Sequence, residues 1–224
     1  MGTIGLSKAN RLFWLGRYLE RVYTSLKATR QIFDKEVDGD EADFKDYCRR
    51  TGIGCNYTDT TDFIRRYYFD LNNLDSVIVS LRCAYDNAIV LRETLSSETL
   101  AYVQMAAAAI QLAAESTAPA VELQWVLDDI MAFRGSCEEN IESESSRNII
   151  KSGASLERLD LYLRLGYPQE VCLRELNHLA SRLKKAQLEA DEGILSVLRE
   201  ALENAGADDN RQVLVAAAEG LITI

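Results

Sequence analysis

Residues 12–28 read LFWLGRYLERVYTSLKA, and this stretch decides the fold class of the chain. Its aliphatic residues recur every three or four positions, which is the spacing of one face of an α-helix. That face consists of Leu12, Leu15, Leu19, Val22 and Leu26. Aromatic neighbours extend the apolar surface almost all round, so other elements must cover this helix on most sides. We expect the helix to be capped at Ser7 and to run to about Lys35.

The rest of the chain repeats this helical spacing, and only 2 prolines interrupt it. Further helices are expected over residues 74–95, 100–114, 121–133, 148–165, 169–189, 192–204 and 210–219. A hydroxyl cap followed by a carboxylate starts a helix at 96–98, and Gly-Tyr-Pro at 166–168 ends one helix before the next. Residues 37–62, rich in Gly, Asp and Thr, are predicted to be a loop-rich insertion. No run alternates with period two, so the sequence predicts an all-α fold, a single helical bundle over residues 1–224.

Composition and charge exclude several classes of function. The chain has 224 residues, of which 47% are hydrophobic and 27% charged, as in globular proteins. Its net charge of -10 disfavours binding to nucleic acid or an anionic membrane. The longest apolar stretch, residues 105–114, is too short to span a bilayer. The first residues lack a signal-peptide core, and the five cysteines form no CxxC pair. We therefore expect reduced thiols and a cytoplasmic location.

A second segment repeats the first helix. Residues 149–165 read IIKSGASLERLDLYLRL and align without gaps with residues 12–28. Gly16 then matches Gly153, and the Leu-Glu-Arg word at 19–21 matches the same word at 156–158. The shared G-x-x-L-E-R spacing indicates two related helices.

The repeated Leu-Glu-Arg motif suggests that the two helices form ion pairs with each other in the core. A glycine one turn before the glutamate lets another helix backbone approach closely. We hypothesise that Glu20 pairs with Arg158, and Glu157 with Arg21, across a pseudo-twofold axis, because buried charges need partners. Two alternatives stay open: the charges lie at helix edges and reach water, or one glutamate is catalytic.

Three segments carry a resemblance to a known family. They are residues 6–28, residues 63–100 and residues 149–168, which together cover about a third of the chain and are spread from end to end. The chain resembles the bacterial alpha-E domain family, named for its helices and its Glu-Arg motif. In the middle segment the matching residues are Arg82, Asn87, Arg92, Glu93, Ser96 and Glu98. The chain departs from the family in being shorter than many members, and its second motif has Ala154 where the first has Arg17.

The resemblance implies a helical domain without a settled activity. Similar domains are fused to, or encoded beside, an ATP-grasp ligase of permuted order and a transglutaminase-like peptidase. This association implies an accessory role in making or processing a peptide or amide-linked product, with these two proteins as partners. The departure at Ala154 puts an arginine-dependent role of the second copy in doubt.

Other chemistry finds little support in the sequence. Neither G-x-x-x-x-G-K-[ST] nor G-x-G-x-x-G occurs, so the usual phosphate-binding loops are absent from it. Glu175 and His178 form one Glu-x-x-His, but a di-iron site uses two such motifs and His178 is the only histidine. Cys48 and Cys55 have no histidine nearby and irregular spacing for zinc. We expect no metal and no cofactor.

Arginines of the middle segment offer a ligand site. Arg82 and Arg92 lie among tyrosines, with Asn87 between them. Planar guanidinium donors beside aromatic rings can receive a carboxylate, as an amino acid or a peptide presents. They can equally pair with neighbouring acids and fix the helices.

These observations leave three functions of different classes. The first is a non-catalytic accessory or binding module of a peptide-forming ligase system. The second is an enzyme of amide-bond chemistry that uses Glu20, Arg21, Glu157 and Arg158, or the group of Arg82, Asn87 and Arg92. The third is a scaffold that forms homo-oligomers through the apolar tail, residues 213–224.

Overall fold

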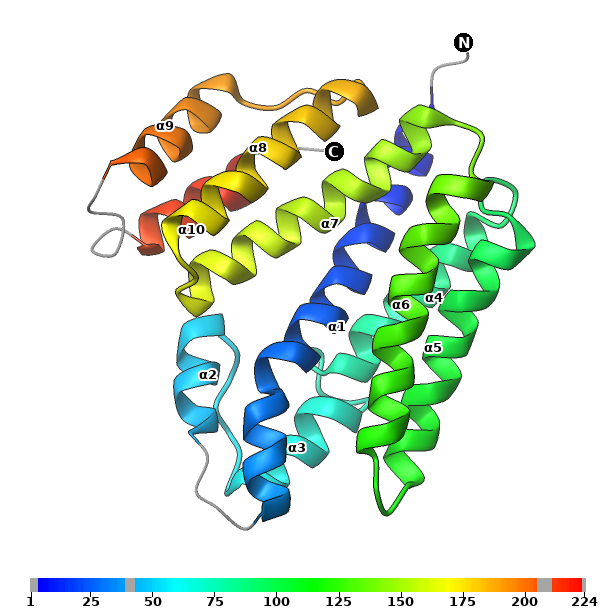
Figure 1. Cartoon of the computed structure of the whole chain (residues 1–224), viewed down its shortest axis with the longest axis vertical. Helices are drawn as coiled ribbons and strands as arrows, with labels where there is room; N and C mark the ends of the chain where they lie inside the picture. Colours follow the sequence, from blue (N-terminus) through cyan, green and yellow to red (C-terminus); the bar gives the residue numbers. More distant parts are fainter. Residues whose placement is uncertain (1–3, 39–42, 205–210, 223–224) are drawn as a thin grey trace. The chain divides into compact units, whose positions relative to one another are not determined.

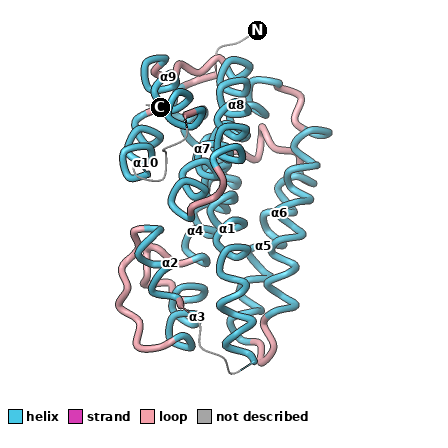
Figure 2. Tube along the Cα trace, turned by 60° about the vertical axis from the view of Figure 1, so that its left-hand side comes forward, coloured by secondary structure: helices cyan, strands magenta, loops and turns pink. Residues whose placement is uncertain are grey.

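The computed structural model describes residues 4–38, 43–204 and 211–222. In these ranges the chain forms ten α-helices and no strand (Figures 1 and 2), which confirms the predicted all-α fold. The helices are α1 (Leu6–Asp38), α2 (Phe44–Thr51), α3 (Thr60–Phe69), α4 (Val77–Val90), α5 (Ser97–Glu115), α6 (Ala120–Asn140), α7 (Glu144–Leu165), α8 (Gln169–Ala186), α9 (Glu192–Glu203) and α10 (Arg211–Gly220). No helix among the described residues has the length and apolar character that crossing a bilayer requires.

The helices form two compact units rather than one bundle. The first unit consists of residues 1–20 and 142–224, and the second of residues 21–141. Helix α1 contributes its first turns to one unit and the remainder to the other. The predicted single bundle is therefore only approximate.

In the first unit, α7 is the central helix. It packs against α8 and α10, and α9 packs against α8 and α10 in turn. Leu159 of α7, Leu176 and Leu179 of α8 and Leu198 of α9 are fully buried. Each replaces water by apolar contacts, which supplies the main stabilisation of the unit. The C-terminal helix is part of this packing, because Leu214, Ala218 and Leu221 are buried as well.

In the second unit, α5 and α6 pack against each other as long neighbours, and α4 lies against α5 (Figure 1). Residue 96 begins α5 as predicted, since the Ser96 hydroxyl accepts a hydrogen bond from the backbone N–H of Thr99 at 3.0 Å. Helix α4 is shorter than the predicted helix over 74–95. It begins after Ser76, whose hydroxyl caps Val79, and it ends at Val90.

The segment 37–62 differs from the predicted loop-rich insertion. Helix α2 occupies residues 44–51 and turns Phe44, Tyr47 and Cys48 inward. Asp43 caps its start and Gly52, at a φ of 77°, ends it in the left-handed region that glycine tolerates. The buried rings join an aromatic cluster, in which the hydroxyl groups of Tyr47 and Tyr67 are hydrogen-bonded at 2.8 Å.

Several other helix ends also differ from prediction. Helix α1 begins at Leu6, so Ser7 lies inside its first turn and is not the cap. Helix α6 continues to Asn140, beyond the predicted end at 133. The stop at residue 166 is confirmed: Gly166 adopts a φ of 80° and its N–H bonds back to α7.

Candidate functional site

The repeated helices cross at their glycines. A methyl group at Gly16 of α1 would overlap the backbone carbonyl of Ile150, and one at Gly153 of α7 would overlap the carbonyl of Phe13. The two contacts are equivalent, because the gapless alignment that pairs residue 16 with 153 also pairs residue 13 with 150. Only glycine permits this approach of two helix backbones. The crossing therefore has the local twofold symmetry that the repeat predicts.

One turn after the crossing, Glu20 and Arg158 form a paired contact. The Arg158 guanidinium donates from Nε to Oε1 of Glu20 over 2.8 Å and from Nη2 to Oε2 over 2.5 Å. The Glu20 side chain is 1% exposed and that of Arg158 is 19% exposed. Two parallel N–H···O bonds to one carboxylate are the strongest arrangement available to such a pair. The predicted Glu20–Arg158 pair is confirmed.

The second glutamate of the repeat is also buried and paired. Glu157 accepts a hydrogen bond at 2.7 Å from Nε of Arg17, and its side chain is 1% exposed. The Arg17 guanidinium lies over the ring of Trp14, 4.8 Å from its centroid. The predicted partner of Glu157, Arg21, belongs to the second unit, so that pair stays a prediction. The alternative that the glutamates reach water at helix edges is wrong for both.

A third carboxylate joins from α8. Glu175 lies 3.3 Å from Nη1 of Arg158 and accepts a hydrogen bond at 2.5 Å from the Ser155 hydroxyl. Arg182 also reaches Glu175, at 3.5 Å, and donates to Ser155. We call these six residues the Glu-Arg cluster: Arg17, Glu20, Glu157, Arg158, Glu175 and Arg182. Their described contacts match three carboxylates with three guanidinium groups.

The paired carboxylates favour the charged form of Arg158. Burial alone would lower the pKa of the Arg158 guanidinium, but its hydrogen bond to Glu20 and the charges of Glu20 and Glu175 outweigh burial and raise that pKa. Asp160, two residues further along α7, behaves differently. Burial raises the pKa of its carboxyl group, and the hydrogen bond from Arg164 offsets this only in part. At Arg158 the paired carboxylates therefore outweigh burial, whereas at Asp160 burial outweighs the pairing with Arg164.

The arrangement is suited to holding helices together. A general acid or base must exchange a proton with a substrate within hydrogen-bonding distance. In the cluster, the described carboxylates already accept hydrogen bonds from guanidinium groups that stay protonated. The contacts link α1, α7 and α8 within the first unit. Their direct consequence is a fixed crossing, in which each charge has a partner.

The sequence of the chain was compared with family models, curated proteins and solved structures. A family model named Alpha-E, described as a predicted alpha-helical domain with a conserved ER motif, matches residues 7–190. The chain belongs to the Alpha-E family. Both copies of the Glu-Arg word lie inside the matched range of this Alpha-E chain, and so does Glu175. Searches of curated proteins and of solved structures found no match.

The repeated motif alone does not predict two members of the Glu-Arg cluster, Arg17 and Glu175. Arg17 lies outside the Leu-Glu-Arg word, and Glu175 lies on another helix, where the sequence offers it only as part of a Glu-x-x-His pair. A signal for Glu175 exists, because it lies on the same helical face as Cys172, Leu176 and Leu179, and a glutamate on an apolar face needs a partner. Its neighbour His178 is half exposed, 3.7 Å from the Glu175 carboxylate. No metal-binding group of three or more ligands occurs among the residues that the structure describes.

The arginines of the middle segment do not gather into one site. Arg82 and Asn87 lie on α4, five residues apart, so they point about 140° away from each other. Arg92 is exposed in the turn that follows α4. Arg82 instead lines a groove with Tyr85, between α4 and α5.

Proposed function

We propose that this Alpha-E chain is a non-catalytic accessory module that binds a carboxylate-bearing peptide for an amide-bond-forming ligase system. The observation that carries the proposal is the groove between α4 and α5, where Arg82 is exposed. Among the described residues Arg82 has no hydrogen bond and no ion pair. An exposed guanidinium group that has no ion pair among the described residues is available to receive a carboxylate.

The groove has the size and lining of a ligand site. Its volume is about 440 Å³, within the range of roughly 300–1,000 Å³ that ligand pockets occupy. Ile78, Ala107 and Ile110 supply an apolar floor. Polar groups stand at its edge, where Gln104 donates a hydrogen bond to the Tyr85 hydroxyl at 3.2 Å. An extended peptide can place apolar side chains on such a floor and its terminal carboxylate on Arg82.

The Glu-Arg cluster supports an accessory rather than a catalytic role. Its carboxylates accept hydrogen bonds from arginines, so the motif of the family stabilises the crossing of α1 and α7 in the first unit. The ATP chemistry of amide-bond formation falls to a partner, because the sequence contains neither of the usual phosphate-binding loops. The resemblance of this chain to domains found beside ATP-grasp ligases and transglutaminase-like proteins supports those two classes as partners.

A purification from native cells tests this proposal. The tagged chain is captured and the retained proteins are identified by mass spectrometry, in parallel with the variants Arg82→Gln and Arg174→Gln. Arg174 is an exposed arginine of α8, far from the groove in sequence and without a described partner, so it controls for loss of charge. We expect an ATP-dependent ligase or a transglutaminase-like protein with the unaltered chain.

Peptide binding is then measured directly with the purified chain. Short peptides with a free C-terminal carboxylate are compared with their C-terminal amides. We expect Arg82→Gln to weaken binding of the acid about fivefold or more and to leave the amide unchanged, whereas Arg174→Gln affects neither. Recovery of the chain alone, together with equal binding of acid and amide, would contradict the proposal.

A further inference from the structure

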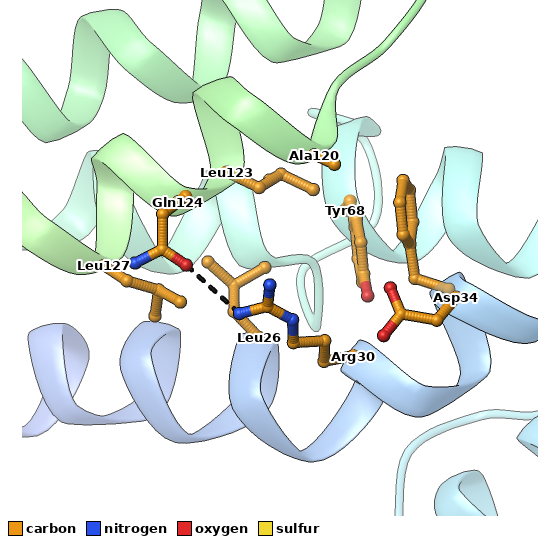
Figure 3. Close-up of a pocket in the computed structure, with 9 residues that line it drawn as sticks. Leu26, Arg30, Asp34, Tyr68, Ala120, Leu123, Gln124 and Leu127 are labelled. Carbon is orange, nitrogen blue, oxygen red and sulfur yellow. Dashed lines mark hydrogen bonds between the residues drawn. The ribbon is translucent and has the colours of Figure 1, made fainter. Parts of the chain in front are cut away.

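A small pocket in the second unit opens between α1, α3 and α6, and no part of the proposed function uses it. Figure 3 shows its walls: Leu26 of α1 faces Leu123 and Leu127 of α6, and Tyr68 of α3 lies beside them. These leucines are each at most 8% exposed. The floor of the pocket is therefore apolar.

Opposite charges stand together on the rim of this pocket. Arg30 and Asp34 are one helical turn apart on α1 and both are exposed (Figure 3). No ion pair joins them among the described residues. Arg30 donates a hydrogen bond from Nη1 to Oε1 of Gln124 at 3.1 Å. Asp34 has no described hydrogen bond, which leaves its carboxylate available to a cation.

Asp34 and Tyr68 line the same side of the pocket, where Figure 3 shows the Asp34 carboxylate beside the Tyr68 hydroxyl. Burial is the main cause that raises the pKa of the Tyr68 hydroxyl, its hydrogen bond with Thr29 lowers it, and the charge of Asp34 adds to the rise. Phe33, next to Asp34 in the chain, also lines the pocket, and its ring stacks on that of Tyr68 with 6.3 Å between centroids. An ammonium group at this point would meet a carboxylate beside an aromatic wall.

The free space sets the size of the ligand. The pocket has a volume of about 40 Å³, and one water needs roughly 10–15 Å³ measured in this way. About three water-sized groups therefore fit, which corresponds to an aliphatic side chain of about three or four carbons. A larger aromatic side chain would not enter.

We propose that this pocket binds a free α-amino acid with a short branched side chain, such as valine or leucine. The carboxylate of the amino acid pairs with Arg30, its ammonium group pairs with Asp34, and its side chain occupies the apolar floor. Residues at i and i+4 of a helix have Cβ atoms about 5–6 Å apart, a spacing that the two charged groups of one amino acid can bridge. A simple anion would meet Asp34 and a simple amine would meet Arg30, so a zwitterion is the better match.

Nuclear magnetic resonance tests the proposal on the full chain. The ¹⁵N-labelled protein is titrated with L-leucine, with N-acetyl-L-leucine, which lacks the ammonium group, and with L-leucinamide, which lacks the carboxylate. We expect saturable shifts for leucine that are confined to residues around the pocket. Each analogue should bind about fivefold more weakly or worse. This result does not depend on the peptide groove, and its failure would leave the purification experiment unaffected.

Variants on one helix provide the controls. Arg30→Gln and Asp34→Asn should each weaken leucine binding about fivefold, whereas Lys35→Gln and Asp38→Asn remove the same charges from exposed positions of α1 that do not line the pocket. Ala120→Leu should abolish binding, because the longer side chain fills the mouth. Circular dichroism confirms that each variant is folded. Absence of saturable shifts, equal affinity for leucine and both analogues, or unchanged binding by the two rim variants would overturn the proposal.

Discussion

Substituting Glu20 and Arg158 together should cost less stability than the sum of the two single substitutions. Two charge-assisted hydrogen bonds, at 2.8 and 2.5 Å, join the residues, and Glu20 is 1% exposed. Breaking a buried ion pair from one side typically costs about 3–5 kcal/mol, since the remaining charge stays buried. Arg158 keeps Glu175 at 3.3 Å, so we expect Glu20→Gln to cost about 2–3 kcal/mol.

Substitution of Arg158 should cost more stability than substitution of Glu20. Arg158→Met leaves Glu20 without its paired guanidinium group and takes a donor from Glu175 as well, so we expect a loss of about 3–5 kcal/mol. In the double variant both charges of the pair are removed, so neither Glu20 nor Arg158 leaves the other as a buried charge. Its cost should fall short of the sum of the single costs by about 2 kcal/mol, within the usual range for residues in contact.

Urea unfolding followed by tryptophan fluorescence measures these values. The chain has 2 tryptophans, Trp14 in the first unit and the half-exposed Trp125 in the second. In a Trp125→Phe background, the fluorescence reports the first unit, which contains the pair. Glu219→Ala serves as a control, since Glu219 pairs with Arg164 at the surface and should contribute about 1 kcal/mol or less. Single costs that add to within about 0.5 kcal/mol would refute the coupling.

Three further predictions concern packing, thiols and a helix start. Gly153→Ala should destabilise the chain by at least about 1–3 kcal/mol in thermal unfolding, because a methyl group overlaps backbone; Gly135→Ala, with nothing within 4 Å, should instead stabilise it by about 0.5–1 kcal/mol. At pH 8 a disulfide reagent should label the exposed Cys55 rapidly and Cys172 slowly, since burial raises the pKa of the Cys172 thiol to about 11 and leaves about one thiolate in a thousand. Labelling of Cys172 should accelerate as the pH rises toward 11, and a rate equal to that of Cys55 at pH 8 would contradict the expected burial. Ser96→Ala should cost about 1 kcal/mol through loss of the bond to the Thr99 N–H, a cost that Ser97→Ala should not share.

Local signals in the sequence were sufficient for most helices and for the crossing. Gly166 ends α7 because glycine adopts the left-handed cap without steric cost, so one residue of the sequence predicts this helix end. The glycines at 16 and 153 stand one turn before matching glutamates, so the repeat predicted both the close approach and one of the ion pairs. Helix α2 was missed because many Asp and Gly residues surround it, although Phe44, Tyr47 and Cys48 already show helical spacing.

Contacts between distant helices were harder to predict. Glu175 meets Arg158 only because α8 packs on α7, and a single sequence carries no record of which helices become neighbours. The position of Arg92 outside α4 depends on a tight turn in which the N–H groups of Thr94 and Leu95 bond to Leu91. The apolar spacing continues through this turn, so periodicity alone extended the helix by five residues.

The division of α1 between two units bears on how the chain is made. All of residues 21–141 are synthesised before the unit around Glu20 can be completed, because that unit needs residues 142–224. At about 5–20 residues per second, roughly four to sixteen seconds pass before those residues are synthesised. During this interval the apolar face around Leu12 and the carboxylate of Glu20 have no partner from α7. The nascent N-terminal segment is therefore open to non-native contacts during synthesis, and substitutions there should lower the yield of folded protein before they alter its final stability.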